Sequence, residues 1–304
     1  MSAILSLVGA TFLVFVIAQS TQDPLLLYAK PGNYGISEEQ KTALRKKLGL
    51  DRPVVIQYAL WFGRAMKGDL GSSIFDELPV TKKIGPRIKP TLQVGLSAWL
   101  FATVVGIPLG VLSAVKRASL WDYFGRVFAL FGQAVPNFWL GIMMILFFSV
   151  RLGWLPSYGL GDGGWFPWKH LIMPVIVLGT STAAGYLRIT RSSMLEILDS
   201  EFVKLARAKG VSNGWVIWKH ALRNALIPPL TVSAVLMASF ITGSLITETV
   251  FSIPGIGRLA VESVSNNDFP LLAGITLVFI AVWVVVNFLS DVMYVVIDPR
   301  IRLS

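Results

Sequence analysis

The chain has 304 residues, of which 54% are hydrophobic and only 14% are Asp, Glu, Lys or Arg, and its formal net charge is +10. Roughly 25% of the residues of a soluble domain are charged, so this composition excludes an ordinary soluble protein and predicts an integral membrane protein. The chain has no cysteine, which excludes disulfides and thiolate metal sites, and its two histidines, His170 and His220, are too far apart in sequence to suggest a zinc centre.

Uncharged, largely apolar runs recur along the chain. A helix needs about 20 such residues to cross the hydrocarbon core of a bilayer. The fourth run has only 17 residues, but its helix can continue past Arg188 if that side chain snorkels to the interface. The sequence therefore predicts an all-α integral membrane protein with six transmembrane helices. The six runs are 1–22, 90–115, 127–150, 171–187, 225–247 and 269–290.

The basic residues predict how these helices are oriented. With the N-terminus inside, the short inner segments hold twelve Lys and Arg, and the two short outer loops hold three. Because short cytoplasmic loops carry the excess of Lys and Arg, we expect both termini to be cytoplasmic. This explanation of the positive charge also means that we expect no nucleic-acid partner. The first run has no basic residues before it and a poor cleavage site, so we expect a retained helix and no cleaved signal peptide.

The predicted organisation has three parts: a first transmembrane helix (1–19), an extracytoplasmic segment (20–89) and a permease core of five helices (90–304). Within the extracytoplasmic segment, Ser37 can cap a helix whose acidic residues precede its basic ones. The stretch from residue 66 to 88 mixes turn residues with amphipathic pieces. It either lies along the membrane surface or forms a solvated loop with a short helix.

Prolines and glycines inside the apolar runs predict local features of the bundle. Pro108, Pro136 and Pro174 lie within predicted helices, where proline produces kinks. Gly106 and Gly110 are four residues apart, a spacing that allows two helices to approach closely.

Motifs typical of enzymes are missing. The sequence has no phosphate-cradling G-x-x-x-x-G-K-[ST], and the G-x-G-x-x-G match at 159–164 lies in a predicted outer loop with no strand before it. We therefore expect no catalytic residue, no metal ligand and no cofactor in this chain. Two acidic residues end apolar runs, Glu248 and Asp291. Each is either a solvated helix end or a functional charge within the membrane.

The longest inner segment, residues 188–224, is basic. Four apolar residues, Met194, Leu198, Phe202 and Leu205, are spaced for one face of a single helix. Gly210 then ends the pattern as a C-terminal glycine does, and Ser212 or Asn213 can cap a second helix. The sequence predicts a helix, a sharp turn and a helix, with Trp215 and Trp218 at the interface. This structure either enters a cleft on a soluble partner or lies on anionic lipid.

Five stretches of sequence resemble a known family. "KLARAKG" (204–210) and "HALRNALIP" (220–228) are similar to the cytoplasmic EAA loop of ABC importer permeases, in the form of the dipeptide, oligopeptide and nickel permease family. The stretches at 68–74, 136–150 and 243–270 fit the same family, and the resemblance extends from about residue 5 to the C-terminus. The glutamate and first alanine of the general EAA pattern are not matched, and neither is its Ile-x-Leu-Pro.

This resemblance implies the membrane subunit of an ATP-driven importer of di- or oligopeptides in a bacterial or archaeal cytoplasmic (inner) membrane. It implies a second, similar permease, two cytoplasmic ATPases that hold ATP and Mg, an extracytoplasmic substrate-binding protein and membrane lipid as partners. The residues expected to couple to an ATPase are Glu201, Lys204, Leu205, Ala206, Arg207, Ala208, Lys209, Gly210 and Val211. The candidate residues of an outer loop or gate are Glu248, Phe251, Pro254, Gly255 and Gly257.

Other functions remain open from the sequence. Within the family, a nickel chelate or another small solute is an alternative substrate. A stand-alone secondary carrier or channel would transport without ATP, and a membrane scaffold would not transport at all.

Overall fold

A computed structural model of the chain describes residues 8–9, 11–13, 15–16, 42, 51–161, 166–242 and 244–297. These residues are mostly helical, and the only β-pairing among them is an isolated bridge between Ser72 and Pro79. The predicted all-α class is confirmed for this part of the chain. The first predicted transmembrane run and the helix expected after Ser37 fall largely outside it.

Four helices among the described residues are long and apolar enough to cross a membrane, and a bent pair of helices gives a fifth if it is one span. The four are 80–115, 168–198, 227–250 and 269–288, and each covers all or most of one of the predicted runs. The count of six stays a prediction because the first run is not described.

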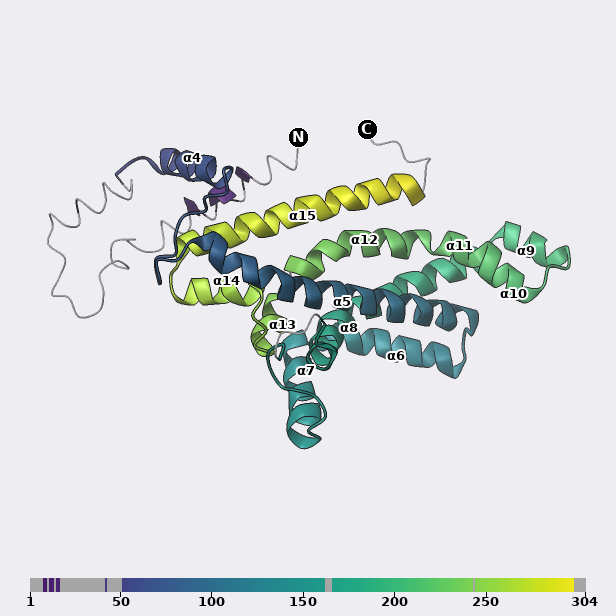
Figure 1. Ribbon diagram of the computed structural model, residues 1–304. Coiled ribbons are helices and arrows are strands. Elements are labelled where there is room, and N and C mark those ends of the chain that lie inside the picture. The colour runs from purple at the N-terminus through teal and green to yellow at the C-terminus, as the bar shows by residue number, and fades with distance from the viewer. Residues whose placement is uncertain are drawn as a thin grey trace. The chain divides into compact units, whose positions relative to one another are not determined.

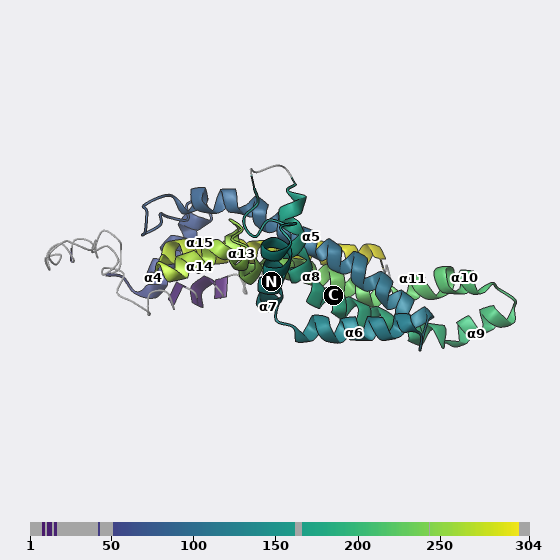
Figure 2. The ribbon, with the colours of Figure 1, turned by 90° about the horizontal axis from the view of Figure 1, so that it is seen from below.

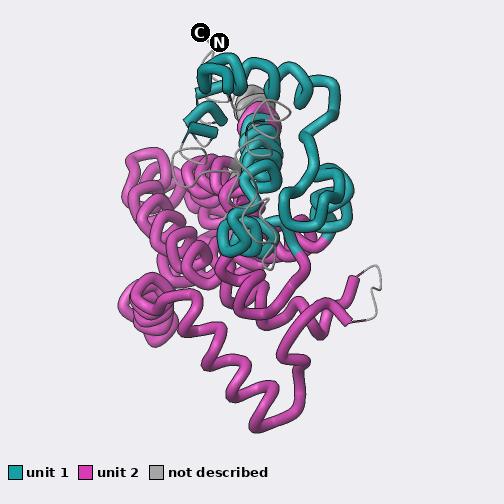
Figure 3. Tube along the Cα trace, turned by 90° about the vertical axis from the view of Figure 1, so that its left-hand side faces the viewer, with its two compact units in different colours: residues 1–89, 255–284 teal, residues 90–254, 285–304 magenta. Residues whose placement is uncertain are grey.

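The chain divides into two compact units, coloured separately in Figure 3. Unit 1 comprises residues 1–89 and 255–284, and unit 2 comprises residues 90–254 and 285–304. The predicted division into 1–19, 20–89 and 90–304 remains a prediction.

Unit 1 contains α4 (Val54–Ala65), the start of α5 (Val80–Val115), α14 (Ile256–Ser265) and the first part of α15 (Phe269–Ile297). Aromatic residues of α4 form its small core. Tyr58 and Trp61 are buried with Ala273 of α15, and Phe62 and Leu277 pack against them. The apolar face of α4 therefore folds against α15.

Helix α5 begins ten residues before the apolar run at residue 90. Val80 and Ile84 are buried, so the amphipathic residues before the run already belong to the helix. Its 36 residues span about 54 Å, more than the roughly 30 Å of hydrocarbon. Part of α5 therefore lies outside the hydrocarbon core.

Unit 2 holds the main hydrophobic core, contributed by α5, α7, α8 and α12 with Phe251 and Ile253. Figure 1 shows the order of its helices. They are α6 (Leu120–Ala134), α7 (Asn137–Met144), the π-helix η1 (Ile145–Arg151), α8 (Trp168–Leu198), α9 (Glu201–Ala208), α10 (Asn213–Trp215), the π-helix η2 (Val216–Ala221), α11 (Leu222–Ala225), α12 (Ile227–Thr242) and α13 (Leu245–Val250).

The prolines have different effects on their helices. Helix α8 continues through Pro174, and α5 continues through Pro108. At Pro136, in contrast, α6 and α7 meet at a bend of 104°, so the predicted kink is present there as a complete break between two helices. Val135 has an extended backbone, as the ring of a following proline favours, and this residue ends α6.

Helices α5 and α8 approach closely at two glycines of α5. A Cβ atom added at Gly106 would lie 2.5 Å from the carbonyl oxygen of Ala183, and one at Gly110 would lie 2.6 Å from the Cβ of Thr190. Neither distance leaves room for a methyl group. The predicted close packing by the glycine pair is confirmed.

We expect Gly106→Ala to lower the stability of the protein in detergent by about 1–3 kcal/mol, because the added methyl group must push two backbones apart. The matched control is Gly85→Ala in the same helix, where nothing lies within 4 Å of the added Cβ. That control should be neutral, or stabilising by up to about 1 kcal/mol through helix propensity. Thermal unfolding measures both variants, and equal melting temperatures would contradict close packing at Gly106.

Candidate functional site

The predicted coupling residues lie together at one end of unit 2. We call residues 201–213 the coupling segment: it comprises α9, the turn after it and the start of α10. Figures 1 and 2 both place α9 and α10 at the opposite end of this unit from α7 and α13. The segment is therefore well separated from the candidate gate residues of α13.

A break precedes the coupling segment. Helix α8 extends to Leu198, well past Arg188, but Ser200 has an extended backbone and α9 starts at Glu201. Met194 is fully buried, whereas Leu205 is 55% exposed. The prediction that Met194, Leu198, Phe202 and Leu205 share one face of one helix is therefore wrong: the four belong to two helices, and only the first two face the core.

The turn at Gly210 is a Schellman motif. Gly210 has φ +80°, its N–H donates to the carbonyl of Arg207 (3.0 Å), and the N–H of Val211 donates to the carbonyl of Ala206 (3.2 Å). A side chain with a Cβ is strained at this φ. The predicted helix-ending glycine is confirmed, and α10 follows with Ser212 at its N-cap position.

Most of the nominated coupling residues are accessible. Glu201 and Lys204 form an exposed ion pair of 2.8 Å, and Ala206 and Val211 are half-buried. The other five, Leu205, Arg207, Ala208, Lys209 and Gly210, are exposed. Among the described residues, neither Arg207 nor Lys209 has an ion-pair partner. The segment thus presents apolar and cationic side chains together, as a docking surface for an acidic partner requires.

Buried residues that sequence reasoning missed hold this segment in place. Val203 of α9 and Val216 of η2 are fully buried, and α9 packs against η2. Behind them, Ala221 and Ala225 lie in one cluster with Met194 of α8 and with the end of α5, through Val111 and Ala114. Continuous packing therefore connects α9 through η2 and α11 to α5 and α8.

Asp122 at the start of α6 anchors the same end of unit 2, and the sequence analysis did not nominate it. Its buried carboxylate accepts two bonds from Arg191 of α8, Nε to Oδ1 (2.8 Å) and Nη2 to Oδ2 (3.1 Å). It also accepts from Arg126 one turn along α6, from Ser113 Oγ of α5 (2.7 Å) and from the N–H of Ala118 (3.0 Å). One side chain thus ties three helices together. In the sequence, the spacing of Asp122 and Arg126, four residues apart on one helix face, could have indicated an ion pair at this position.

Glu248 is buried. It lies in α13, and its Oε1 accepts hydrogen bonds from Thr91 Oγ1 of α5 and from Ser244 Oγ, each 2.7 Å long. Of the two readings that the sequence left open, the solvated helix end is therefore wrong for Glu248. The side chain of Asp291 is outside the described residues.

The predicted tight turn after α13 is present, but a serine makes it. Ser252 has φ +51°, its N–H donates to the carbonyl of Thr249 (3.2 Å), and the N–H of Ile253 donates to the carbonyl of Glu248 (2.8 Å). Phe251 is fully buried, and Pro254 is exposed. The two nominated glycines serve α14, with Gly255 at its N-cap position and Gly257 buried in its first turn.

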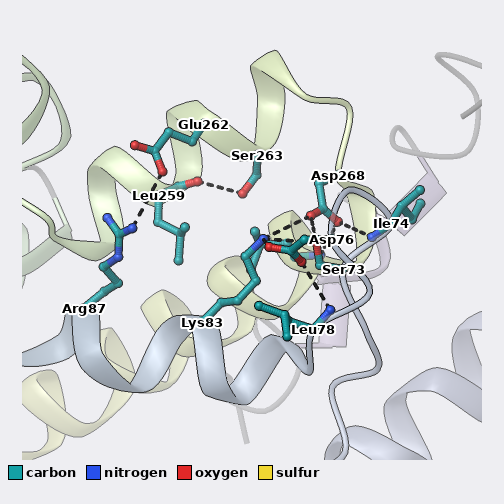
Figure 4. A network of polar contacts seen from close by, with 11 residues as sticks. Ser73, Ile74, Asp76, Leu78, Lys83, Arg87, Leu259, Glu262, Ser263 and Asp268 are labelled. Carbon is teal, nitrogen blue, oxygen red and sulfur yellow. Dashed lines mark hydrogen bonds and ion pairs between the residues drawn. The ribbon is translucent and has the colours of Figure 1, made fainter. Parts of the chain in front are cut away.

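In unit 1, the buried carboxylate of Asp268 joins two stretches, 68–74 and 243–270, that each resemble the permease family in sequence. Asp268 Oδ2 accepts from Ser73 Oγ, and its Oδ1 accepts from the N–H of Ile74 (3.1 Å) and of Leu271 (3.4 Å). Asp268 therefore holds the 71–79 loop and caps α15 at once (Figure 4).

Lys83 of α5 completes this network. Its Nζ lies 2.7 Å from Asp76 Oδ2 and 3.9 Å from Asp268 Oδ2, between the two carboxylates. Burial raises the pKa of Asp76, but the hydrogen bonds from Lys83 and Ser73 outweigh this effect and keep that pKa below its usual value. The loop is thus held by paired charges. Among the described residues, no group of three or more His, Asp or Glu could hold a metal ion.

Comparison with known proteins identifies relatives over nearly the whole chain. The family described as "Binding-protein-dependent transport system inner membrane component" matches residues 106–303. The dipeptide transport system permease protein DppB of Escherichia coli (strain K12) is 38% identical, covering 97% of this chain and 94% of DppB. The oligopeptide transport system permease protein AppB of Bacillus subtilis (strain 168) is also 38% identical, covering 97% of this chain and 95% of AppB.

A solved structure shares the fold. The inward-facing methionine ABC transporter MetNI contains a chain with a TM-score of 0.58 and 19% identity, covering 71% of this chain and 96% of that one.

We expect Asp268→Asn to loosen the 71–79 loop, because an amide cannot accept from all of these donors and Lys83 loses part of its compensating charge. A lost hydrogen bond to a charged group corresponds to about 2 kcal/mol, or roughly 30-fold faster hydrogen exchange of the loop amides. Exchange of Ile74, measured by mass spectrometry, tests this. The control is Asp51→Asn, at an exposed residue outside the network. Unchanged exchange in Asp268→Asn would show that the loop is held by other contacts.

Proposed function

Because the chain belongs to the family of binding-protein-dependent transport system inner membrane components, we propose that it is the transmembrane permease subunit of an ATP-driven ABC importer that moves di- or oligopeptides across the cytoplasmic membrane. The observation that carries this proposal is the similarity to dipeptide and oligopeptide permeases over 97% of the chain. It covers the coupling segment as well as the membrane helices.

The chain itself is a translocating subunit and not an enzyme. We place ATP and Mg on two partner ATPases, substrate delivery on an extracytoplasmic binding protein, and the other half of the path on a second, similar permease. Both termini are cytoplasmic in this proposal, in the membrane of a bacterium or archaeon. The charge distribution of the short loops supports that orientation.

We assign the coupling of ATP hydrolysis to residues 201–211. Phe202 and Leu205 are 44% and 55% exposed, and they would occupy a cleft on an ATPase, while Arg207 and Lys209 would pair with acidic groups on its rim. ATP-driven closure of the ATPases would then push α9. Through η2 and α11, the push would reach α5 and α8, which would move together because Asp122 and the glycine contacts hold them.

The energy required of this coupling is modest. ATP binding needs to favour one of two packings of the bundle by a few kcal/mol. Glu248, Phe251 and the turn after α13 are proposed to lie at the outer gate, where the buried carboxylate would fix α13 against α5.

Two alternatives make different predictions. A nickel-chelate or other small-solute importer would need the same partners but would not carry peptides. A stand-alone carrier or channel would transport without ATP, and it would need no exposed cationic segment.

The test is reconstitution in liposomes of this chain with its second permease, ATPases and binding protein. We expect uptake of labelled di- or oligopeptides that depends on ATP and on the binding protein. This chain alone should give no uptake. Peptide uptake by the single chain without ATP would instead indicate a carrier or channel.

In the same system, Gly210→Val should abolish most uptake and leave membrane insertion and ATPase activity in place, because a β-branched residue is strained at φ +80° and shifts α9. Gly210→Asn, which tolerates this conformation better, should keep more uptake. Gly214→Val is the control: Gly214 lies four residues away, has no positive φ and has nothing within 4 Å of an added Cβ. Normal uptake by Gly210→Val would refute the coupling role of the turn.

A further inference from the structure

Two arginines one turn apart on α8 have different environments. Arg191 is bound in two places by the buried Asp122. Arg188 is exposed, and its one hydrogen bond to a described residue runs from Nη1 to the side-chain oxygen of Gln133 on α6 (3.2 Å). No carboxylate of the described residues forms an ion pair with Arg188. A guanidinium has five N–H donors, so most of its binding capacity for an anion is unused.

The partner of the Arg188 guanidinium lies beside the preceding turn of α8. Gly132 of α6 packs against Ala184, and an added Cβ at Gly185 would lie 3.9 Å from Gln133 Nε2. Gln133 is therefore level with the turn of α8 that precedes Arg188. The bond to Gln133 draws the guanidinium towards the N-terminal end of α8, as helical side chains tend to tilt. The helix continues past Arg188 to Leu198, as the sequence analysis expected.

Arg188 lies on a polar stripe of α8. Ser181, Gly185, Arg188 and Ser192 are spaced 4, 3 and 4 residues apart and so share one face of the helix. Arg188 and Ser192 are exposed in this chain, whereas Tyr186 and Leu187 on the other faces are fully buried. A charge within a transmembrane segment faces the bundle interior or a water-filled cavity, because exposure to lipid is costly. This stripe therefore faces the path and not the lipid.

We propose that Arg188 binds the terminal carboxylate of the peptide as it crosses the membrane, with Gln133 as the residue that positions the guanidinium. This inference rests on the proposed function. Peptides of different sequence share their backbone and terminal charges, so one fixed cation can contact all of them. Arginine binds a carboxylate with two parallel hydrogen bonds, and an exposed pair of this kind is weak enough to release the peptide.

The test compares a peptide that has a free C-terminal carboxylate with the same peptide as its C-terminal amide, in the reconstituted full transporter. Both are supplied at concentrations that saturate the binding protein, so that the permease determines the difference. We expect wild type to take up the acid faster than the amide by up to about fivefold, the range of an exposed ion pair. Arg188→Gln should reduce uptake of the acid to the level of the amide.

Further variants separate binding from folding. Arg188→Lys keeps the charge without the planar fork and should keep part of the preference for the acid. Ser192→Ala, on the same stripe, should leave the preference unchanged. If Arg188→Gln lowers uptake of both peptides equally, or leaves their ratio unchanged, the carboxylate site is wrong and Arg188 serves assembly instead. Failure of wild type to take up either peptide would overturn the proposed function itself.

Discussion

The bundle in residues 90–254 depends on one buried carboxylate at its coupling end. Asp122 is surrounded by donors from α5, α6 and α8, and it is bound in two places by Arg191. A buried charge is stable only when its partners satisfy it, so the three helix ends have little freedom to separate. The glycine contacts between α5 and α8 continue this restraint further into the bundle. A displacement applied at this end therefore moves several helices as one body.

The coupling segment packs, through η2 and α11, against the ends of α5 and α8. Its rigid features are the Schellman turn at Gly210 and the buried Val203, and its accessible features are the apolar and cationic side chains around them. Glu248 is held in a similar way within unit 2: the Thr91 hydroxyl joins it to α5, and the hydroxyl of Ser244 binds it at the start of its own helix, α13. At Asp122 and at Glu248, a buried carboxylate in an apolar protein is held by several partners. Such restraints suit a protein that changes between two defined packings rather than one that deforms gradually.

The sequence predicts some of this well. Composition and the apolar runs identify the membrane class, and the helix-ending role of Gly210 follows from local chemistry, because only glycine readily adopts its backbone conformation. The spacing of Gly106 and Gly110 predicts close packing for a similar reason. The glycine at 210 and the spacing of the glycine pair are visible in the sequence itself, although the partner of the pair, α8, is not.

The failures have a common physical cause, which is tertiary context. The pattern of Met194 to Leu205 predicts one helix, but nothing in it reveals the break at Ser200, where the chain leaves α8. Glu248 looks like a helix end until Thr91, over 150 residues away, is seen to donate to it. Asp122 is unremarkable in the sequence because its main partner is 69 residues distant.

The most direct test is site-specific cross-linking from the coupling segment. Because the chain has no native cysteine, a single introduced cysteine is the one thiol of this subunit that can react. A single cysteine at Leu205, in the assembled transporter, should cross-link to amines of an ATPase subunit through a short, cleavable linker that reacts with a thiol at one end and an amine at the other. The cross-link should stop uptake until the linker is cleaved. Labelling of that cysteine by an impermeant reagent from outside intact cells, with no cross-link to an ATPase, would contradict the account.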